Sequence, residues 1–367
     1  MNATIMKKIY LLLALPVLLL SCNKQDPAAG KAAASDAGEC LLTVNLSDGH
    51  ARSKVASQSA VNETVINNVQ VFVFRAGDGP DSGMLDVCAS AGFPNPLVGE
   101  NGNYDKMKLK CSAGTREIWA VVNDAVDHTA KGSGVSNRND LLALTTELKD
   151  NASTRLFMIG STTEELRSGS AEVSVKVKRV CASVILESVT NDFIAPSYQA
   201  TGMFRVKDCF LMNVPAMTNF GQTVEAASLT DPKYWYARMA AETASPQKDL
   251  IFDRVDPSVE VNYGSACRTV HTFYSYPNNC GFSRDNNWSP RATMLVVEAE
   301  LKNGPFWDTY YYPVVFESLE SNKQYRVNLT VKRPGSTDPN DPVEFTDMIP
   351  VITVEDWESG ESYNPEI

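Results

Sequence analysis

Residues and motifs that are typical of enzymes are scarce in this sequence. Three of the 367 residues are histidines, namely His50, His128 and His271, and no two have the spacing of a metal-binding motif. The chain also lacks a GxSxG elbow, a P-loop and a dinucleotide-binding fingerprint, and no cysteine lies in a nucleophile signature. A glycosidase-like pair among its scattered carboxylates is the enzymatic alternative that stays open. We interpret the histidines as surface or loop residues, and we expect no enzyme, no cofactor and no metal site.

Basic residues are outnumbered by acidic ones, with 33 Lys and Arg against 44 Asp and Glu and a formal net charge of -11. Non-specific binding to nucleic acid depends on clustered cations that replace the counterions of the phosphates. We therefore exclude nucleic acid as a partner. The acidity favours solubility and does not identify a substrate.

Long hydrophobic runs are absent except near the N-terminus, where two lysines precede an apolar run over residues 11–20. This run is too short for an ordinary membrane-spanning helix and is typical of a signal peptide. It ends in LLSC, which resembles the lipobox of bacterial lipoproteins, whose cysteine is lipidated and becomes the new N-terminus. We predict a lipoprotein signal peptide over residues 1–22, lipidation at Cys22 and attachment to the bacterial outer membrane. The polar tail over residues 23–38 offers no core in which Cys22 could be buried.

The remaining seven cysteines include no CxxC pair. Because exported proteins can form disulfides, these residues matter, yet their pairing does not follow from the sequence. Cys181 and Cys209 could equally be reduced residues of a core.

The composition of the chain is typical of a protein made mostly of β-strands. Short runs of Val, Ile, Tyr, Phe and Thr alternate with clusters of Gly, Pro, Asn and Asp, and the hydrophobic share of 43% can fill two cores. We predict an all-β fold with few helices, one sandwich over residues 39–189 and a second over residues 190–367. A one-residue slip in the hydrophobic alternation between Val177 and Val180 marks the junction, because it indicates a bulge or a strand that passes between sheets.

The segment ECLLTVNLSDGHAR, over residues 39–52, has the two-residue period of a strand that buries one face. An Asp-Gly turn and a small, polar linker up to residue 68 follow it, and this linker carries a basic site at Arg52. A core strand that is joined in this way could be removed by a protease. Its buried face would consist of Cys40, Leu42, Val44 and Leu46.

Removal of this strand would leave a sheet with unpaired backbone groups and an apolar trough. Burying four apolar side chains, at roughly 1.5 to 3 kcal/mol each, contributes on the order of 6 to 12 kcal/mol. This is comparable to the net stability of a whole domain, so the strand should stay until another strand replaces it. Such an exchange is a form of β-augmentation, and a head-to-tail contact that does not close on itself makes a filament.

A second strand-like segment lies near the C-terminus, over residues 344–357. Its alternation predicts Met348, Ile352 and Val354 on one face and Trp357 on the other. Earlier, two long irregular segments over residues 231–255 and 278–290 carry aromatic residues. These residues either form a contact surface or pin the loops to the core.

The chain resembles the FimA-type fimbrillins, the lipoprotein-derived type V pilins of Bacteroidetes. The stretches that carry the resemblance are LLSC at Cys22, LLTVNLSDGHAR, NVQVFVFRAGDG, VKRVCASVILES and YRVNLTVKRPGSTDPNDPVEFTDMIPVITVEDW. The resemblance implies two transthyretin-like antiparallel β-sandwich domains and removal of the first strand by a trypsin-like, arginine-directed surface protease. The cut falls at Arg52, with Lys54 as the nearest alternative. The donor strand of the next subunit falls within residues 344–367, where the candidate residues are Met348, Ile352, Val354 and Trp357.

We therefore expect a structural subunit of a surface fimbria, whose partners are other fimbrillin subunits in a head-to-tail polymer. The alternative is a tip or accessory adhesin that binds a host glycan or protein through the segments between residues 231 and 290. Such a subunit would accept a donor strand without having to supply one. An anchor subunit of the same system would keep its first strand.

Overall fold

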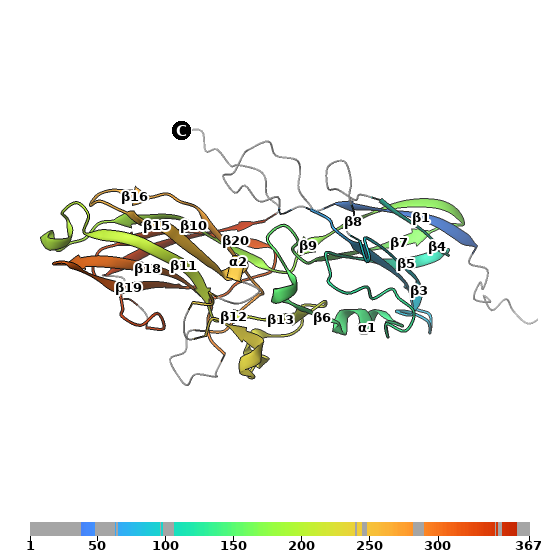
Figure 1. The fold of residues 1–367 in the computed structure, drawn as a ribbon. Helices are drawn as coiled ribbons and strands as arrows, with labels where there is room; N and C mark the ends of the chain where they lie inside the picture. The colour runs from blue at the N-terminus through green and yellow to red at the C-terminus, as the bar shows by residue number, and fades with distance from the viewer. Residues whose placement is uncertain are drawn as a thin grey trace, which may run out of the picture. The chain divides into compact units, whose positions relative to one another are not determined.

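The computed structural model describes residues 38–47, 63, 65–95, 97, 106–238, 241–243, 248–281, 290–341, 343 and 347–357 (Figure 1). Strands dominate this part of the chain, and its helices, α1 (Arg138–Ala143) and α2 (Lys248–Ile251), are short. No helix among these residues is long and apolar enough to cross a membrane. The predicted all-β sandwich architecture is confirmed.

Two sheets form the N-terminal sandwich, and β1 (Glu39–Ser47) occupies the middle of the smaller one. The three-stranded sheet has the order β4-β1-β8, and the five-stranded sheet has the order β3-β2-β5-β7-β9. The other strands of these sheets are β2 (Val69–Arg75), β3 (Leu85–Ala91), β4 (Lys106–Ser112), β5 (Gly114–Val122), β7 (Met158–Leu166), β8 (Gly169–Lys176) and β9 (Lys178–Arg179).

The strand β2 is buried on both faces, as is typical of a strand with apolar side chains on both of its sides. Val71 and Val73 belong to the cluster that also contains the inward side chains of β1. Phe72 and Phe74 point the other way, into a second cluster that includes Leu141 of α1. The five-stranded sheet therefore separates two layers of core.

The C-terminal sandwich packs a β16-β10-β20-β21 sheet, with β17 also paired to β10, against a β15-β11-β18-β19 sheet. The strands of the first sheet are β10 (Ala182–Asn191), β16 (Ala266–Cys267), β17 (His271–Ser275), β20 (Lys323–Val331) and β21 (Met348–Asp356). The strands of the second are β11 (Phe204–Met212), β15 (Phe252–Glu260), β18 (Met294–Asn303) and β19 (Phe306–Val315). Two small pairings complete the set, β12 (Val214–Pro215) with β14 (Trp235–Tyr236) and β13 (Met217–Asn219) with β6 (Thr145–Glu147).

Short 3₁₀ turns connect several of these strands in the described part of the chain. They lie at Leu148–Asp150, Pro196–Tyr198, Ala226–Ser228 and Pro232–Tyr234.

The slip in hydrophobic alternation near Val177 marks a chain that changes sheets. β8, β9 and β10 follow one another within residues 169–191, yet each belongs to a different sheet. A strand that changes sheets must turn its apolar side toward a new core, and this reverses the parity of the pattern. The predicted division at residues 189 and 190 falls inside β10, and the division into two domains stays a prediction.

A side-chain cap is present at the start of α1. The side chain of Asn137 accepts a hydrogen bond from the backbone of Asp140, and the Asp140 carboxylate accepts one from the backbone of Asn137. This reciprocal pair is a capping box, which satisfies backbone donors that the first turn leaves free. A six-residue helix depends on such a cap because its nucleus is costly to form.

The interpretation of the histidines as surface or loop residues is wrong for His271. This residue lies in β17 and is buried, and its Nδ1 lies 2.7 Å from Oδ2 of Asp253. His128 does lie in a loop, where its Nε2 is 3.1 Å from Oδ2 of Asp124. Each of the two rings therefore has a carboxylate partner, as polar groups that are largely buried require. His50 falls outside the described residues.

Candidate functional site

The four apolar side chains of β1 form part of the N-terminal core. Cys40, Leu42 and Val44 have exposed fractions of 0%, and Leu46 has 9%. They pack in one cluster with inward residues of β2 and β5. The opposite side of β1 faces outward, so the strand buries one face, as its alternation predicts.

β1 lies between two strands that do not pair with each other. It runs antiparallel to β4, with Glu39 opposite Ser112 and Asn45 opposite Lys106. On its other edge it runs parallel to β8, from Cys40 beside Gly169 onwards. Removal of β1 would leave β4 and β8 about 10 Å apart, twice the usual strand spacing, with unpaired backbone groups on both sides. Only another extended strand can satisfy both edges at once.

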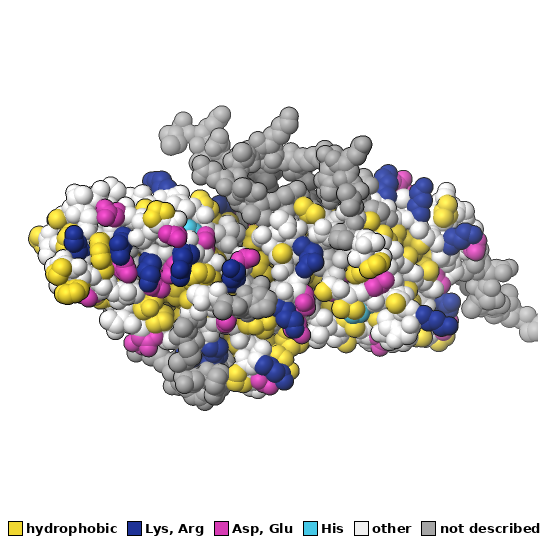
Figure 2. Space-filling model, viewed as in Figure 1, with side chains coloured by type: hydrophobic (Ala, Val, Ile, Leu, Met, Phe, Trp, Pro, Cys, Tyr) yellow, Lys and Arg dark blue, Asp and Glu magenta, His cyan; other side chains and the backbone are white. Residues whose placement is uncertain are grey.

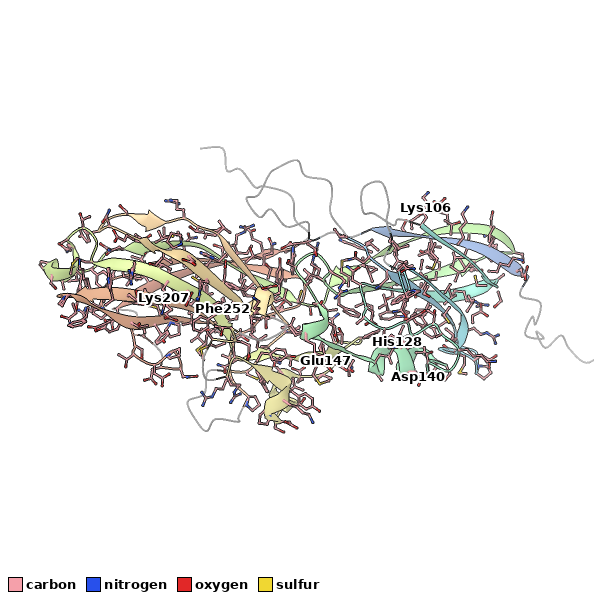
Figure 3. The ribbon with its side chains drawn as sticks, in the orientation of Figure 1. Lys106, His128, Asp140, Glu147, Lys207 and Phe252 are labelled. Carbon is pink, nitrogen blue, oxygen red and sulfur yellow. The ribbon has the colours of Figure 1, made fainter. Side chains whose placement is uncertain are left out.

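The outward side of β1 is held by a few polar contacts. Asn45 Nδ2 donates a hydrogen bond to Oε1 of Glu172 on β8 at 2.8 Å, and Lys106 Nζ on β4 lies 3.6 Å from the same oxygen (Figure 3). The hydrogen bond from Asn45 and the charge of Lys106 lower the pKa of Glu172. All these groups are close to solvent, where ion pairs contribute little to stability. The buried face therefore supplies most of the energy that retains β1.

We expect Leu42→Ala in the uncut chain to lower the free energy of unfolding of the N-terminal sandwich by about 2 to 5 kcal/mol, because it leaves a cavity in a fully buried position. Thr43→Ala, on the outward side of the same strand, should change it by less than about 0.5 kcal/mol. Urea denaturation, followed by a probe in the N-terminal sandwich, compares the two. Equal effects would contradict the proposed role of the buried face.

Three residues that the sequence singles out lie outside the described residues. They are Cys22, the predicted lipidation site, and Arg52 and Lys54, the predicted cleavage sites. The structure describes the chain up to the end of β1 and again from Glu63. The predictions for lipidation and cleavage therefore stay predictions.

The C-terminal strand β21 is the edge of its sheet and is poorly covered. Among the described residues it pairs with β20 alone, with Met348 opposite Val331 and Val354 opposite Tyr325. Met348 is buried, whereas Ile352 and Val354 are 36% and 53% exposed although they lie on the same side of the strand. Exposed aliphatic side chains on an edge strand are a surface on which another β segment can pair.

Beyond β21 the chain is fastened by Trp357, which is itself buried. Its ring stacks on Tyr274, with centroids 6.0 Å apart, and Cζ of Arg179 lies 4.7 Å from the ring centroid. Its Nε1 donates a hydrogen bond to Oε2 of Glu63 at 3.1 Å. Glu63, Arg179, Tyr274 and Trp357 together form what we name the Trp357 cluster.

Two further hydrogen bonds join the members of the Trp357 cluster. The Tyr274 hydroxyl donates to Oε1 of Glu63, and Arg179 Nη2 donates to the backbone oxygen of Glu63 at 3.0 Å. Burial, together with the nearby Glu63 carboxylate, raises the pKa of Tyr274, so the phenol stays protonated and can donate. The cluster thus links Glu63, which lies in the predicted cleavage linker, with the end of β21.

Sequence reasoning identified Trp357 but missed Glu63, Arg179 and Tyr274. Their positions are more than 80 residues apart from one another, so no local pattern connects them. A weak signal exists for Arg179, which interrupts an apolar run between Val177 and Val180. A charged residue at such a position often needs a buried partner.

Replacing Trp357 with alanine should loosen β21 without unfolding the second sandwich. A buried Trp→Ala change typically costs about 3 to 5 kcal/mol, and here the loss acts at the end of an edge strand. We expect faster hydrogen exchange of the β21 amides. Trp307→Ala, which removes a half-buried ring packed at 4.0 Å from Cζ of Arg205, is the matched control and should leave β21 protected. Unchanged exchange in both variants would show that the cluster does not hold the strand.

One aromatic residue of the two long irregular segments, Trp235, is packed inside the protein. Trp235 is buried in a small cluster with Leu229 and Cys280, and its Nε1 donates to the backbone oxygen of Leu229. This favours the second of the two interpretations of these loops for Trp235. Trp288 falls outside the described residues.

Charged side chains of both signs are interspersed over β11, β15 and β18 (Figure 2). Lys207 Nζ lies 2.6 Å from Oε1 of Glu298, and Arg205 Nη2 lies 2.5 Å from Oε2 of Glu300 (Figure 3). A shallow depression of about 260 Å³ beside these pairs is lined by the same mixture of charges. Because its cations and carboxylates neutralise one another, it presents no strong field to a charged ligand.

No family model matches the chain, and no curated protein matches it. Among solved structures, it is similar to a fimbrilin (FimA) of Porphyromonas gingivalis, with a TM-score of 0.60 and 15% sequence identity. That alignment covers 87% of this chain and 97% of the other. The chain has the fold of a fimbrilin.

Two further structures share the fimbrilin fold with it. A proposed cell adhesion protein of Bacteroides eggerthii has a TM-score of 0.59 and 21% identity, covering 87% of this chain and 96% of the other. A second proposed cell adhesion protein, from Parabacteroides distasonis, has a TM-score of 0.61 and 17% identity, covering 87% and 99%. At these identities the likeness concerns the fold.

Proposed function

We propose that the protein is a structural subunit of a bacterial surface fimbria, which polymerises by exchanging its first strand for a strand of a neighbouring subunit. The observation that carries the proposal is the position of β1. It fills the centre of a sheet with four buried side chains, yet its C-terminal end leads into the segment that contains Arg52. The fimbrilin fold supports this assignment.

In this proposal the chain is exported as a lipoprotein through Cys22, and an arginine-directed surface protease then cuts after Arg52. The groove between β4 and β8 becomes available to a donor when β1 leaves. Any donor must present apolar side chains at every second position, because the groove is lined on one side only. One donor per groove and one groove per subunit give an open, head-to-tail filament.

We propose β21 and the residues after it as the donor. β21 and β1 are both nine residues long, and Ile352 and Val354 have the same two-residue spacing as the buried side chains of β1. Pro350 limits how much of β21 can be inserted. Proline cannot donate a hydrogen bond to a ladder and is suited to an edge strand rather than to the centre of a sheet. The inserted part should therefore begin after Pro350.

Treatment of the purified chain, kept reduced, with an arginine-specific protease tests the proposal. We expect a new N-terminus at Ser53 and the appearance of filaments in electron micrographs, with a ladder of oligomers on gels. A chain that is cut at Arg52, loses its first strand and nevertheless stays monomeric would contradict it. Deletion of residues 358–367 separates the alternatives, because a stalk subunit should stop polymerising whereas a tip adhesin should still cap fibres.

A further inference from the structure

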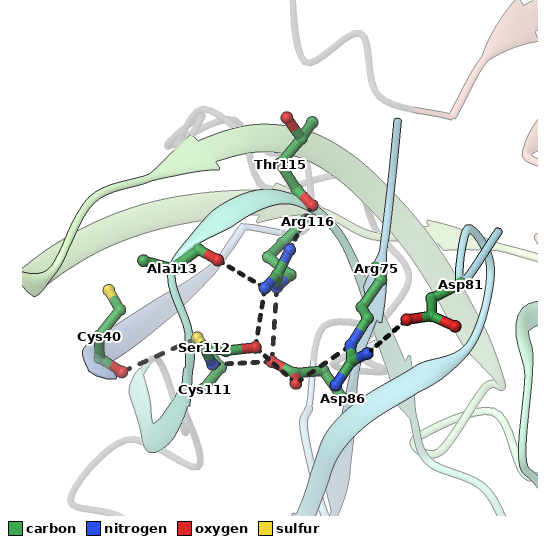
Figure 4. Close-up of polar contacts among 9 residues, drawn as sticks. All are labelled: Cys40, Arg75, Asp81, Asp86, Cys111, Ser112, Ala113, Thr115 and Arg116. Carbon is green, nitrogen blue, oxygen red and sulfur yellow. Dashed lines mark hydrogen bonds and ion pairs between the residues drawn. The ribbon is translucent and has the colours of Figure 1, made fainter. Parts of the chain in front are cut away.

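Cys40 and Cys111 face each other across the β1–β4 ladder. Both side chains lie on the buried face of the small sheet, with exposed fractions of 0% and 5%. The Cys111 thiol donates to the backbone oxygen of Cys40, with 3.8 Å between sulfur and oxygen (Figure 4). On the other edge of β1, the residue beside Cys40 is Gly169. Within the described ladders of β1, Cys111 is therefore the cysteine that Cys40 can reach.

The ladder places the two residues at a distance that a disulfide can span. The Ala113 amide donates to the Gly38 oxygen at 2.8 Å, so these two opposed residues form a hydrogen-bonded pair. Such pairs recur at every second position, which makes Cys40 and Cys111 a hydrogen-bonded pair with Cα atoms about 5.5 Å apart. Disulfides occur at Cα separations of about 4.4 to 6.8 Å.

Their Cβ atoms must move closer for the bond to form. Opposed Cβ atoms lie about 4.5 to 5.5 Å apart, with hydrogen-bonded pairs at the wide end, whereas a disulfide holds them at about 3.8 Å. The two strands would therefore approach each other slightly. A disulfide formed at such a site is easier to reduce than a relaxed one.

The β4 side of this pair is held firmly. Next to Cys111, the amide and hydroxyl of Ser112 donate to the Asp86 carboxylate of β3 at 2.8 Å and 2.7 Å (Figure 4). Arg116 of β5 adds an ion pair, with Nε 3.4 Å from Asp86 Oδ2, and its Nη2 donates to the Ala113 oxygen at 2.6 Å. Cys111 is thus anchored to the part of the sandwich that remains after cleavage.

We propose that Cys40 and Cys111 form a disulfide that ties the removable strand to β4. The bond requires an external disulfide as oxidant, such as oxidised glutathione or a protein dithiol oxidant. One cysteine thiolate attacks that disulfide and gives a mixed disulfide, and the second thiolate displaces the remaining half. Two protons leave the cysteines, two electrons reduce the oxidant to two thiols, and one S–S bond forms.

The bond should form while the chain folds, before β1 is enclosed. Burial is the largest cause that raises the pKa of Cys111 to about 11, and the neighbouring Cys40 is the second. The reactive thiolate is therefore scarce once the sandwich is complete. In the open chain both thiols meet the oxidant freely. Once enclosed, the disulfide is shielded from exchange in turn.

The consequence concerns the cut chain and rests on the proposed function. Cleavage at Arg52 would no longer release the first strand, because Cys40 would stay bonded to Cys111. The groove would remain filled, and the lipidated peptide that begins at Cys22 would remain attached to the subunit. Reduction would free both, so a thiol reductant becomes a second requirement for assembly, after the protease.

Peptide mapping of the full chain tests the bond directly. The chain is refolded in oxidised glutathione, its free thiols are alkylated, and it is digested with pepsin in acid, where thiols do not exchange. We expect a peptide with Cys40 linked to one with Cys111. Cys111→Ser should lose this linkage, whereas Cys88→Ser, at a half-buried thiol of β3, should keep it. Mapping of the unchanged chain decides the matter even where a variant fails to fold.

The same oxidised chain, cut at Arg52, tests the consequence. We expect complete loss of peptide release on non-reducing gels, and release with filament formation after dithiothreitol is added. The proposal is overturned if Cys40 is found alkylated after oxidative refolding, or linked to another cysteine. If the linkage forms but the cut, reduced chain makes no filaments, the disulfide stands and the proposed function fails.

Discussion

A chain that carries Arg52→Gln and Lys54→Gln together is expected to remain monomeric after treatment with a trypsin-like protease, under conditions in which the unchanged chain forms filaments. The linker up to residue 68 contains no other lysine or arginine, so the double variant removes every basic cleavage site in it. The first strand then stays covalently joined to its own sandwich. We expect complete loss of polymer, measured by electron microscopy and size-exclusion chromatography.

The physical reason is the difference between a tethered and a free strand. A tethered strand competes for the groove at an effective concentration in the millimolar range, whereas a donor from another molecule is present at its bulk concentration. The buried side chains of β1 stabilise the strand in the groove further. Lys131→Gln, at an exposed loop position, is the matched control and should leave cleavage and assembly intact. Filaments formed by the double variant would refute removal of β1 as the trigger.

The second large effect is expected on the donor side, where β21 offers a matched pair of positions. Val351 and Val354 lie on opposite sides of one strand and are 57% and 53% exposed. Val354→Asp should abolish polymerisation, because the new carboxylate would have to enter an apolar groove. Loss of the valine burial alone, about 1.5 to 3 kcal/mol, weakens insertion by about 10-fold to 150-fold. Val351→Asp should have little effect on assembly.

Both variants should leave the monomer stable, since both side chains are already exposed in the subunit. Circular dichroism of the uncut proteins checks this, and sedimentation of the cut proteins measures polymer. A result in which Val351→Asp blocks assembly and Val354→Asp does not would mean that β21 inserts with its other face. Normal assembly of both would exclude β21 as the donor.

Several elements could be predicted from the sequence because each is encoded by a local pattern. The alternation in residues 40–46 shows one buried face for β1, and the slip near Val177 marks the change of sheet. The cap at Asn137 likewise follows from residues within one helical turn. In each case the residues that determine the feature lie close together in the sequence.

Other features could not be predicted because they depend on long-range pairing. Alternation reports which face of a strand is buried but not which strand lies beside it, so the parallel pairings of β1 with β8 and of β10 with β20 were not expected. The same limit applies to β21, whose apolar side looks like a core face in the sequence. Because β21 is an edge strand beside β20, the apolar side chains on that face are only partly covered, and Val354 is exposed.

The Trp357 cluster has a practical consequence for anyone who wishes to display a peptide on this scaffold. Glu63 and Trp357 share one set of contacts, so an insert fused close to either end of the chain that the proposed cleavage would leave should disturb the other end as well. The loop over residues 130–134 is a better attachment point. It is exposed, and its glycines at 132 and 134 adopt backbone angles that need no support from neighbouring side chains. In the proposed fibre, a guest sequence grafted there should be carried at every repeat without touching the groove or the strand that fills it.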